Sequence, residues 1–199
     1  MTMVKSLKTL SLLGLLVPGI AFAQFSDSYN FLKAVRDRDG AKTTEIISKP
    51  GNVIIDTRDQ SNGETALHIV TRERDAVWMR FLLARDAKTD MRDKQGNTPL
   101  MLAAQIGFLE GVQLLIAHKA SVDLPNGSGE TPLIRAVQNR DAPIAQLLMA
   151  NGANPDKADT GAGLSARDYA LRDRRSAAIV KIIETTKPSR AASKTAGPN

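Results

Sequence analysis

One short motif recurs along this chain at an almost constant interval. It consists of a glycine, a hydroxyl residue two positions later and then an apolar run. Copies occur at Gly63–Val70, Gly96–Ala104, Gly129–Val137 and, more weakly, Gly163–Ala170. Their hydroxyl residues are Thr65, Thr98, Thr131 and Ser165, which are 33, 33 and 34 residues apart. Chance does not keep that register over three intervals, so the chain is built from a repeated structural unit.

The residues of one unit predict two short helices. Each Thr or Ser can cap a helix N-terminus, and Pro99 and Pro132 fall at the first helical position, where a missing N–H costs nothing. A second apolar set follows about thirteen residues after each hydroxyl with the period of one helix face, as at Met79 and Leu82. Gly96 and its counterparts suit a turn that needs a permissive backbone. Neither helix can bury its apolar face alone, so the sequence predicts an all-α solenoid stabilised by stacking of neighbouring units.

The motif resembles that of the ankyrin-repeat family, which has a 33-residue unit and a Thr-Pro-Leu-His-x-Ala pattern. The resemblance spans roughly residues 28–184, and residues 93–125 match it best. Two departures are Ala66 in place of the proline and Ile134 in place of the histidine. The resemblance implies an ankyrin-repeat solenoid.

We expect a repeat domain over residues 24–184, with about five helix-turn-helix units. The first unit lacks the Thr-Pro-Leu segment, and the last carries an extra residue near Gly161 and polar residues on its first helix, so we expect both to be degenerate caps. The expected units are about 27–59, 60–92, 93–125, 126–158 and 159–184.

The first 23 residues have the three parts of a secretory signal peptide. Lys5 and Lys8 precede an apolar run from about Leu10 to Ile20, and Ala21-Phe22-Ala23 is a small-x-small cleavage site. The run is interrupted by Pro18 and is short for a membrane span, which takes about 20 apolar residues. We expect cleavage after Ala23 and, in a Gram-negative bacterium, a periplasmic protein. An uncleaved anchor or a buried N-terminal helix is the alternative.

The net charge of +6 is concentrated at the two ends of the chain. Two lysines belong to the predicted signal peptide. Lys187, Arg190 and Lys194 lie in residues 185–199, a segment rich in Ser, Ala and Pro that we expect to be a disordered basic tail. The repeat body is therefore close to neutral. That distribution, the predicted export and an aromatic content of only 4% argue against nucleic-acid binding.

The composition also argues against an enzyme. The chain has no cysteine, and its two histidines, His68 and His118, both have places in the repeat. His68 occupies the motif's structural histidine position, and His118 falls near the end of a second helix. We therefore expect no catalytic constellation, no metal site, no cofactor and no apolar pocket of the kind an active site needs.

The architecture implies a binding module, expected to be a monomer that docks a folded periplasmic protein as a scaffold or inhibitor. The family resemblance places the contacts on the concave face, at the turn tips and the ends of the first helices. These positions are Ser61, Asn62, Glu64, Arg72, Glu73, Lys94, Gln95, Asn97, Gln105, Ile106, Ser128, Glu130, Gln138 and Asn139. Ile106, the one apolar member, is either an exposed anchor for the partner or packed within its own repeat.

An alternative function is association with the cell envelope. The basic tail could hold peptidoglycan or anionic lipid, or the protein could restrain a wall-remodelling or stress-protection enzyme.

Overall fold

The computed structural model describes residues 19–49 and 54–186 of the chain, with side chains described from Asp27 onward. Over these residues it contains ten α-helices and two short 3-10 helices. The helices are α1 (Gly19–Arg36), α2 (Gly40–Ile47), η1 (Ile54–Asp56), α3 (Ala66–Arg72), α4 (Ala76–Leu83), α5 (Pro99–Gln105), α6 (Leu109–Ala117), α7 (Pro132–Gln138), α8 (Ala142–Ala150), α9 (Ala166–Arg172), η2 (Arg174–Ser176) and α10 (Ala177–Thr185).

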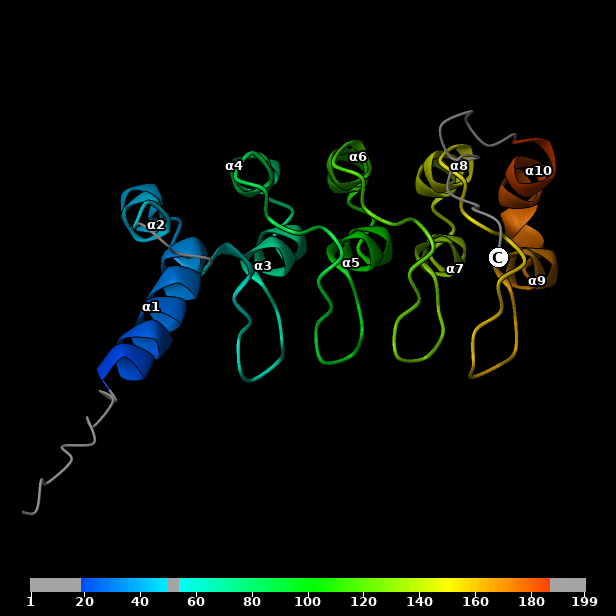
Figure 1. The fold of residues 1–199 in the computed structure, drawn as a ribbon. Coiled ribbons are helices and arrows are strands. Elements are labelled where there is room, and N and C mark those ends of the chain that lie inside the picture. The colour runs from blue at the N-terminus through cyan, green and yellow to red at the C-terminus, as the bar shows by residue number, and fades with distance from the viewer. Residues whose placement is uncertain (1–18, 50–53, 187–199) are drawn as a thin grey trace, which may run out of the picture.

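The helices form two rows (Figure 1). From the second pair onward, the odd-numbered helices make an inner row in which α3 contacts α5, α5 contacts α7 and α7 contacts α9. The even-numbered helices make an outer row, in which α4, α6, α8 and α10 contact one another in sequence. Long turns before α3, α5, α7 and α9 project from the inner row on one side of the molecule (Figure 1). This arrangement confirms the predicted all-α solenoid.

The inner helices begin where the hydroxyl residues predict. The Thr98 side chain accepts a hydrogen bond from the Met101 N–H at 3.2 Å, and Thr131 accepts one from Ile134 at 3.3 Å. Pro99 and Pro132 both occupy the first helical turn. Because Thr98 and Met101 are buried, the hydroxyl takes the place of water as the partner of the Met101 N–H.

Replacing Thr98 by alanine is expected to lower the free energy of unfolding by about 1–2 kcal/mol, the usual cost of losing an N-cap. The measurement is urea-induced unfolding followed by far-UV circular dichroism. Thr98→Ser, which keeps the hydroxyl, is the control and should lose much less. Equal losses for the two variants would show that the methyl group, and not the cap, matters at this site.

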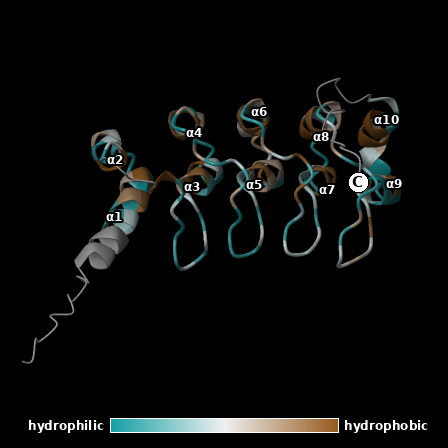
Figure 2. Ribbon diagram, in the orientation of Figure 1, coloured by the Kyte–Doolittle hydropathy of each residue, from teal (hydrophilic) through white to brown (hydrophobic). Residues whose placement is uncertain are grey.

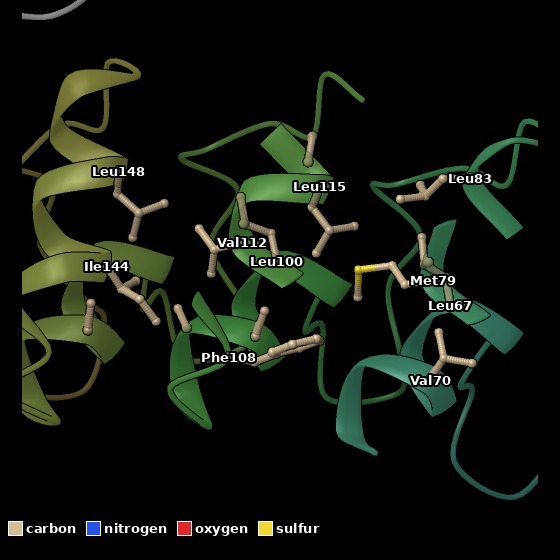
Figure 3. Close-up of a cluster of buried hydrophobic side chains, with 14 of the residues drawn as sticks. Leu67, Val70, Met79, Leu83, Leu100, Phe108, Val112, Leu115, Ile144 and Leu148 are labelled. Atoms are coloured by element: carbon tan, nitrogen blue, oxygen red, sulfur yellow. The ribbon is translucent and has the colours of Figure 1, made fainter. Parts of the chain in front are cut away.

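The core lies between the two rows and runs continuously through the units. Leu67, Met79, Leu100, Leu115 and Leu148 are fully buried, and Figure 3 shows side chains from three successive units meeting there. The hydropathy colours show a similar division, with hydrophobic residues on helices such as α5, α6, α8 and α10 and largely hydrophilic residues in the first two long turns, although α9 is itself largely hydrophilic (Figure 2). Burial of each such side chain is worth about 1.5–3 kcal/mol, so stacking supplies the stability that the short helices lack.

Arginines at the turns between inner and outer helices join neighbouring units, which the sequence did not predict. Arg38, Arg74 and Arg140 have positive φ angles of 55–57°, a strained conformation for a residue with a side chain. Each guanidinium reaches the next unit. Arg74 donates to the carbonyls of Ile106 and Gly107 at 3.0 and 2.9 Å, Arg38 pairs with Asp75, and Arg140 pairs with Asp173.

The first helix is longer than the sequence suggested. It runs from Gly19 to Arg36 and so passes through the predicted cleavage site after Ala23. Residues 1–18 and 187–199 lie outside the described residues, so the signal peptide and the disordered tail stay predictions. The predicted start of the tail at residue 185 is wrong, because Thr185 is the last residue of α10. In the part of the chain that is described, no helix is both long and apolar enough to cross a membrane.

Candidate protein-interaction surface

Each of the four long turns is folded by an Asp or Asn side chain that bonds its own turn. The Asp59 carboxylate accepts from the Ser61 N–H at 2.8 Å, Asp93 accepts from Gln95 at 2.8 Å, and the Asn126 side-chain oxygen accepts from Ser128 at 2.9 Å. Asp159 does the same in the last turn, with the Ala162 N–H at 2.7 Å.

The turns are also bonded to one another through their backbones. Three hydrogen bonds join them in a row: Lys94 N–H to Asn62 C=O at 2.9 Å, Gly127 N–H to Gln95 C=O at 2.9 Å, and Thr160 N–H to Ser128 C=O at 3.0 Å. In each, the donor is the residue that follows the turn's Asp or Asn. We call this row the turn ladder. It fixes the four turns as one continuous surface.

The glycines of the motif permit this close approach. Gly96 has a φ of +82°, and a Cβ placed on it would lie 2.7 Å from the Gly127 backbone nitrogen. Gly63 and Gly129 have the same geometry against the next turn. The sequence predicted the permissive backbone, but not that the neighbouring turn leaves no room for a side chain.

Comparison with known protein families agrees with this geometry. A family model for ankyrin repeats, in three copies, matches residues 31–126 and 79–159. The chain belongs to the ankyrin-repeat family. Ankyrin repeats are protein–protein interaction modules, and the turn ladder with the exposed ends of the inner helices is the candidate surface considered below.

Nine of the fourteen predicted contact residues are exposed on this ankyrin surface. Most lie at the turn tips or at the ends of α3, α5 and α7. They are Ser61, Asn62, Arg72, Glu73, Lys94, Gln95, Gln105, Ser128 and Asn139. Asn139 also has an internal role, because its side-chain N–H donates to the Gln105 carbonyl at 2.6 Å and so caps the end of α5.

Two predicted contact residues are buried, and we remove them from the contact set. Glu64 is 5% exposed, pairs with Arg72 and accepts from the Asn62 side chain at 2.8 Å. Asn97 is 4% exposed and donates to Asp93 and Gln95, both at 3.1 Å. Both side chains stabilise the turns from inside, which their polar character did not reveal.

Three further predicted contact residues are half-buried, namely Ile106, Glu130 and Gln138. Glu130 pairs with Arg135 at 2.7 Å and lies near Gln138, so its carboxylate is largely engaged within the repeat. Ile106 packs against the hydrophobic core, which favours the packed alternative over an exposed anchor. Its carbonyl oxygen is held by Arg74.

His68 is a structural residue, as the motif predicts. It is fully buried, with Nε2 3.0 Å from the Asn97 carbonyl and Nδ1 2.8 Å from the Thr65 hydroxyl and 3.2 Å from the Thr65 nitrogen. A neutral ring that carries its proton on Nε2 satisfies all three contacts. Burial lowers the pKa of His68 below its usual range, which keeps the ring neutral. The ring therefore links two repeats and is inaccessible to a substrate.

The acidic side chains of the turns accept hydrogen bonds from backbone N–H groups and from neighbouring side chains, such as the Asn97 amide on Asp93 and the Tyr169 hydroxyl on Asp159. Over residues 27–49 and 54–186, no three His, Cys, Asp or Glu side chains come close enough to hold a metal ion. Hydrogen bonds from the Ser61 hydroxyl and N–H, with the Arg36 guanidinium, lower the pKa of Asp59 to about 2. Asp59 is thus an ionised part of its turn at any physiological pH.

The sequence missed a groove at the N-terminal end. It has a volume of about 620 Å³ and lies between α1 and the first turn, lined among others by Tyr29, Leu32, Arg36, Arg58 and Gln60. The expectation that the solenoid holds no such pocket is therefore wrong at this end. One sequence feature could have predicted the groove, namely the absence of the Thr-Pro-Leu segment from the first unit. A unit without a projecting turn leaves the space beside the next turn unfilled.

Proposed function

We propose that this ankyrin-repeat protein is exported and binds a folded periplasmic protein, as a monomer and without catalysis, through its turn ladder and inner-helix ends. The partner would sit across the middle turns, where Lys94, Gln95 and Ser128 are exposed. The observation that supports this proposal is the backbone bonding between successive turns. A surface that is already ordered loses little conformational entropy on binding.

The chemistry of the surface favours a polar partner. Its exposed residues are mainly amides, hydroxyls and a few charges of both signs, and the described middle turns carry no large exposed apolar side chain. Such surfaces gain affinity from hydrogen bonds and shape complementarity more than from apolar burial. A folded protein with its own hydrogen-bonding surface suits these positions better than an unfolded apolar chain.

A photo-crosslinking amino acid at Gln95 tests the surface in living cells. Gln113, which is exposed on outer helix α6, is the matched control. We expect a discrete adduct from the Gln95 position, identified by mass spectrometry, and none of the same mass from Gln113. The same adduct from both positions, or none from Gln95, would contradict the proposed surface.

A pull-down with charge-bearing variants gives the quantitative test. Gln95→Arg is expected to lower recovery of the crosslinked partner about tenfold, because a bulky charge would face the interface. Gln113→Arg should leave recovery unchanged. Equal recovery with both variants would move the site away from the turn ladder.

A further inference from the structure

The groove at the N-terminal end lies beside the first long turn, on the side where each later turn packs against the turn before it. At this position the chain has α1 and no preceding turn. Figure 1 shows that α1 extends to the same side of the molecule as the long turns and slants away from the turn that precedes α3. One wall is α1, with Ser28, Tyr29, Leu32 and Arg36, and the other is the segment from Thr57 to Ser61. The Thr57 hydroxyl donates to the Ser28 hydroxyl at 2.9 Å and so joins the two walls. A volume of about 620 Å³ lies within the range of pockets that hold ligands.

The turn ladder ends in this groove with an unused donor. In the second, third and fourth turns, the residue after the turn's Asp or Asn donates its N–H to the preceding turn. The corresponding residue of the first turn is Gln60, which follows Asp59 and lines the groove. Its N–H has no hydrogen-bond partner among the residues that the structure describes. An extended backbone in the groove would supply the missing carbonyl, as a preceding turn would have done.

The side chains around Gln60 indicate which chemical groups a ligand of this groove would need. Tyr29 is 65% exposed, and with Leu32 it offers an apolar wall. Arg36 is neutralised by Asp59, at 2.5 Å, whereas Arg58 is exposed and forms no ion pair within the described part of the chain. The groove therefore has one uncompensated positive charge next to an apolar wall and a backbone donor.

We propose that this groove binds an extended, acidic segment of another protein. The segment accepts the Gln60 N–H with a backbone carbonyl, lays an apolar side chain on Tyr29 and Leu32, and places a carboxylate on Arg58. The segment would take the place of a preceding turn in the ladder, so that a backbone hydrogen bond fixes its position and its side chains give specificity. The chain's own residues 187–199 do not suit the groove, because they carry three basic and no acidic side chains.

The site goes beyond the proposed function, because it lies at the end of the stack and shares only Ser61 with the proposed contact surface. Peptide binding therefore tests it separately. The probes are two fluorescein-labelled nine-residue peptides, one alternating valine with aspartate and the other alternating valine with lysine. By fluorescence anisotropy, we expect the acidic peptide to bind the purified protein at least tenfold more tightly than the basic peptide.

Charge reversal identifies the residue responsible. Arg58→Glu should weaken binding of the acidic peptide at least tenfold and strengthen binding of the basic one. Arg174→Glu, an exposed arginine at the far end of the molecule, is the matched control and should change neither. Both arginines are exposed, so neither variant is expected to affect folding, and thermal melts check this.

Amide hydrogen exchange tests the ladder itself. Saturation with the acidic peptide should slow exchange at Gln60, while Lys94, whose N–H is already bonded to Asn62, should change little. Equal affinity for the two peptides, no effect of Arg58→Glu, or unchanged exchange at Gln60 would each overturn the proposal. The variant Gln95→Arg, which tests the middle turns, should bind the acidic peptide normally.

Discussion

Replacing Gly96 by alanine is expected to lower the free energy of unfolding by about 3 kcal/mol. Two costs add at this position. A left-handed backbone costs a residue with a side chain about 1–2 kcal/mol, and Gly96 has a φ of +82°. The new Cβ would also lie 2.7 Å from the Gly127 nitrogen, so the hydrogen bond that joins these turns must stretch or break. Urea unfolding measures the loss.

Two other glycines separate these costs. Gly163 has a φ of +65°, but a Cβ added there would meet nothing within 4 Å, so Gly163→Ala should lose only about 1 kcal/mol. Gly40 has open space and lies at the start of α2, so Gly40→Ala should be neutral or stabilising by up to about 1 kcal/mol. If Gly96→Ala lost no more than Gly163→Ala, close stacking of the turns would not contribute to stability.

Replacing His68 by alanine is expected to cost about 3 kcal/mol as well. The change leaves a cavity in a fully buried site and removes the partner of the Asn97 carbonyl and of the Thr65 N–H. Because the bond to Asn97 crosses to the next repeat, the variant should also lose cooperativity. Unfolding followed separately at Trp78, which lies in the same unit as His68, and by circular dichroism would show this as two transitions that no longer coincide.

The same histidine predicts how stability depends on pH. Its pKa is lowered in the folded protein, so below about pH 6.5 the unfolded state binds more protons than the folded state. Stability should therefore fall as the pH decreases from about 7.5 to about 5.5. The variant His68→Met carries the residue that the next repeat has at the equivalent position, Met101. It should be less stable than the wild type, but its free energy of unfolding should depend less on pH across this interval. Identical slopes for the two proteins would contradict a buried neutral histidine.

Local features of the sequence predicted most of the fold. The helix starts at Thr98 and Thr131, and the turn glycine at Gly96, follow from capping and from backbone conformation within a few residues. The 33-residue register then places each unit beside the next, because every unit must bury the same apolar face. His68 was assigned correctly for the same reason, since its position in the motif predicts a buried environment.

The candidate site was only partly predictable. Gln95 and Asn97 are both polar turn residues two positions apart, yet Gln95 is exposed and Asn97 is only 4% exposed. Which of them faces solvent depends on how the next turn stacks against them, through contacts about one repeat length away in the sequence. The arginine links from Arg74 and Arg140 were missed for a similar reason, because their partners lie in the following unit.

The sequence by itself therefore determined the repeat, its helices and the family, since these depend on periodic apolar burial and local backbone preferences. The tertiary structure alone decided which turn residues are available to a partner, and that the ladder ends at Gln60 beside an open groove. The physical reason is that stacking satisfies each turn with the one before it. The first turn has a helix in that place, and a helix with its own hydrogen bonds offers no backbone partner to Gln60.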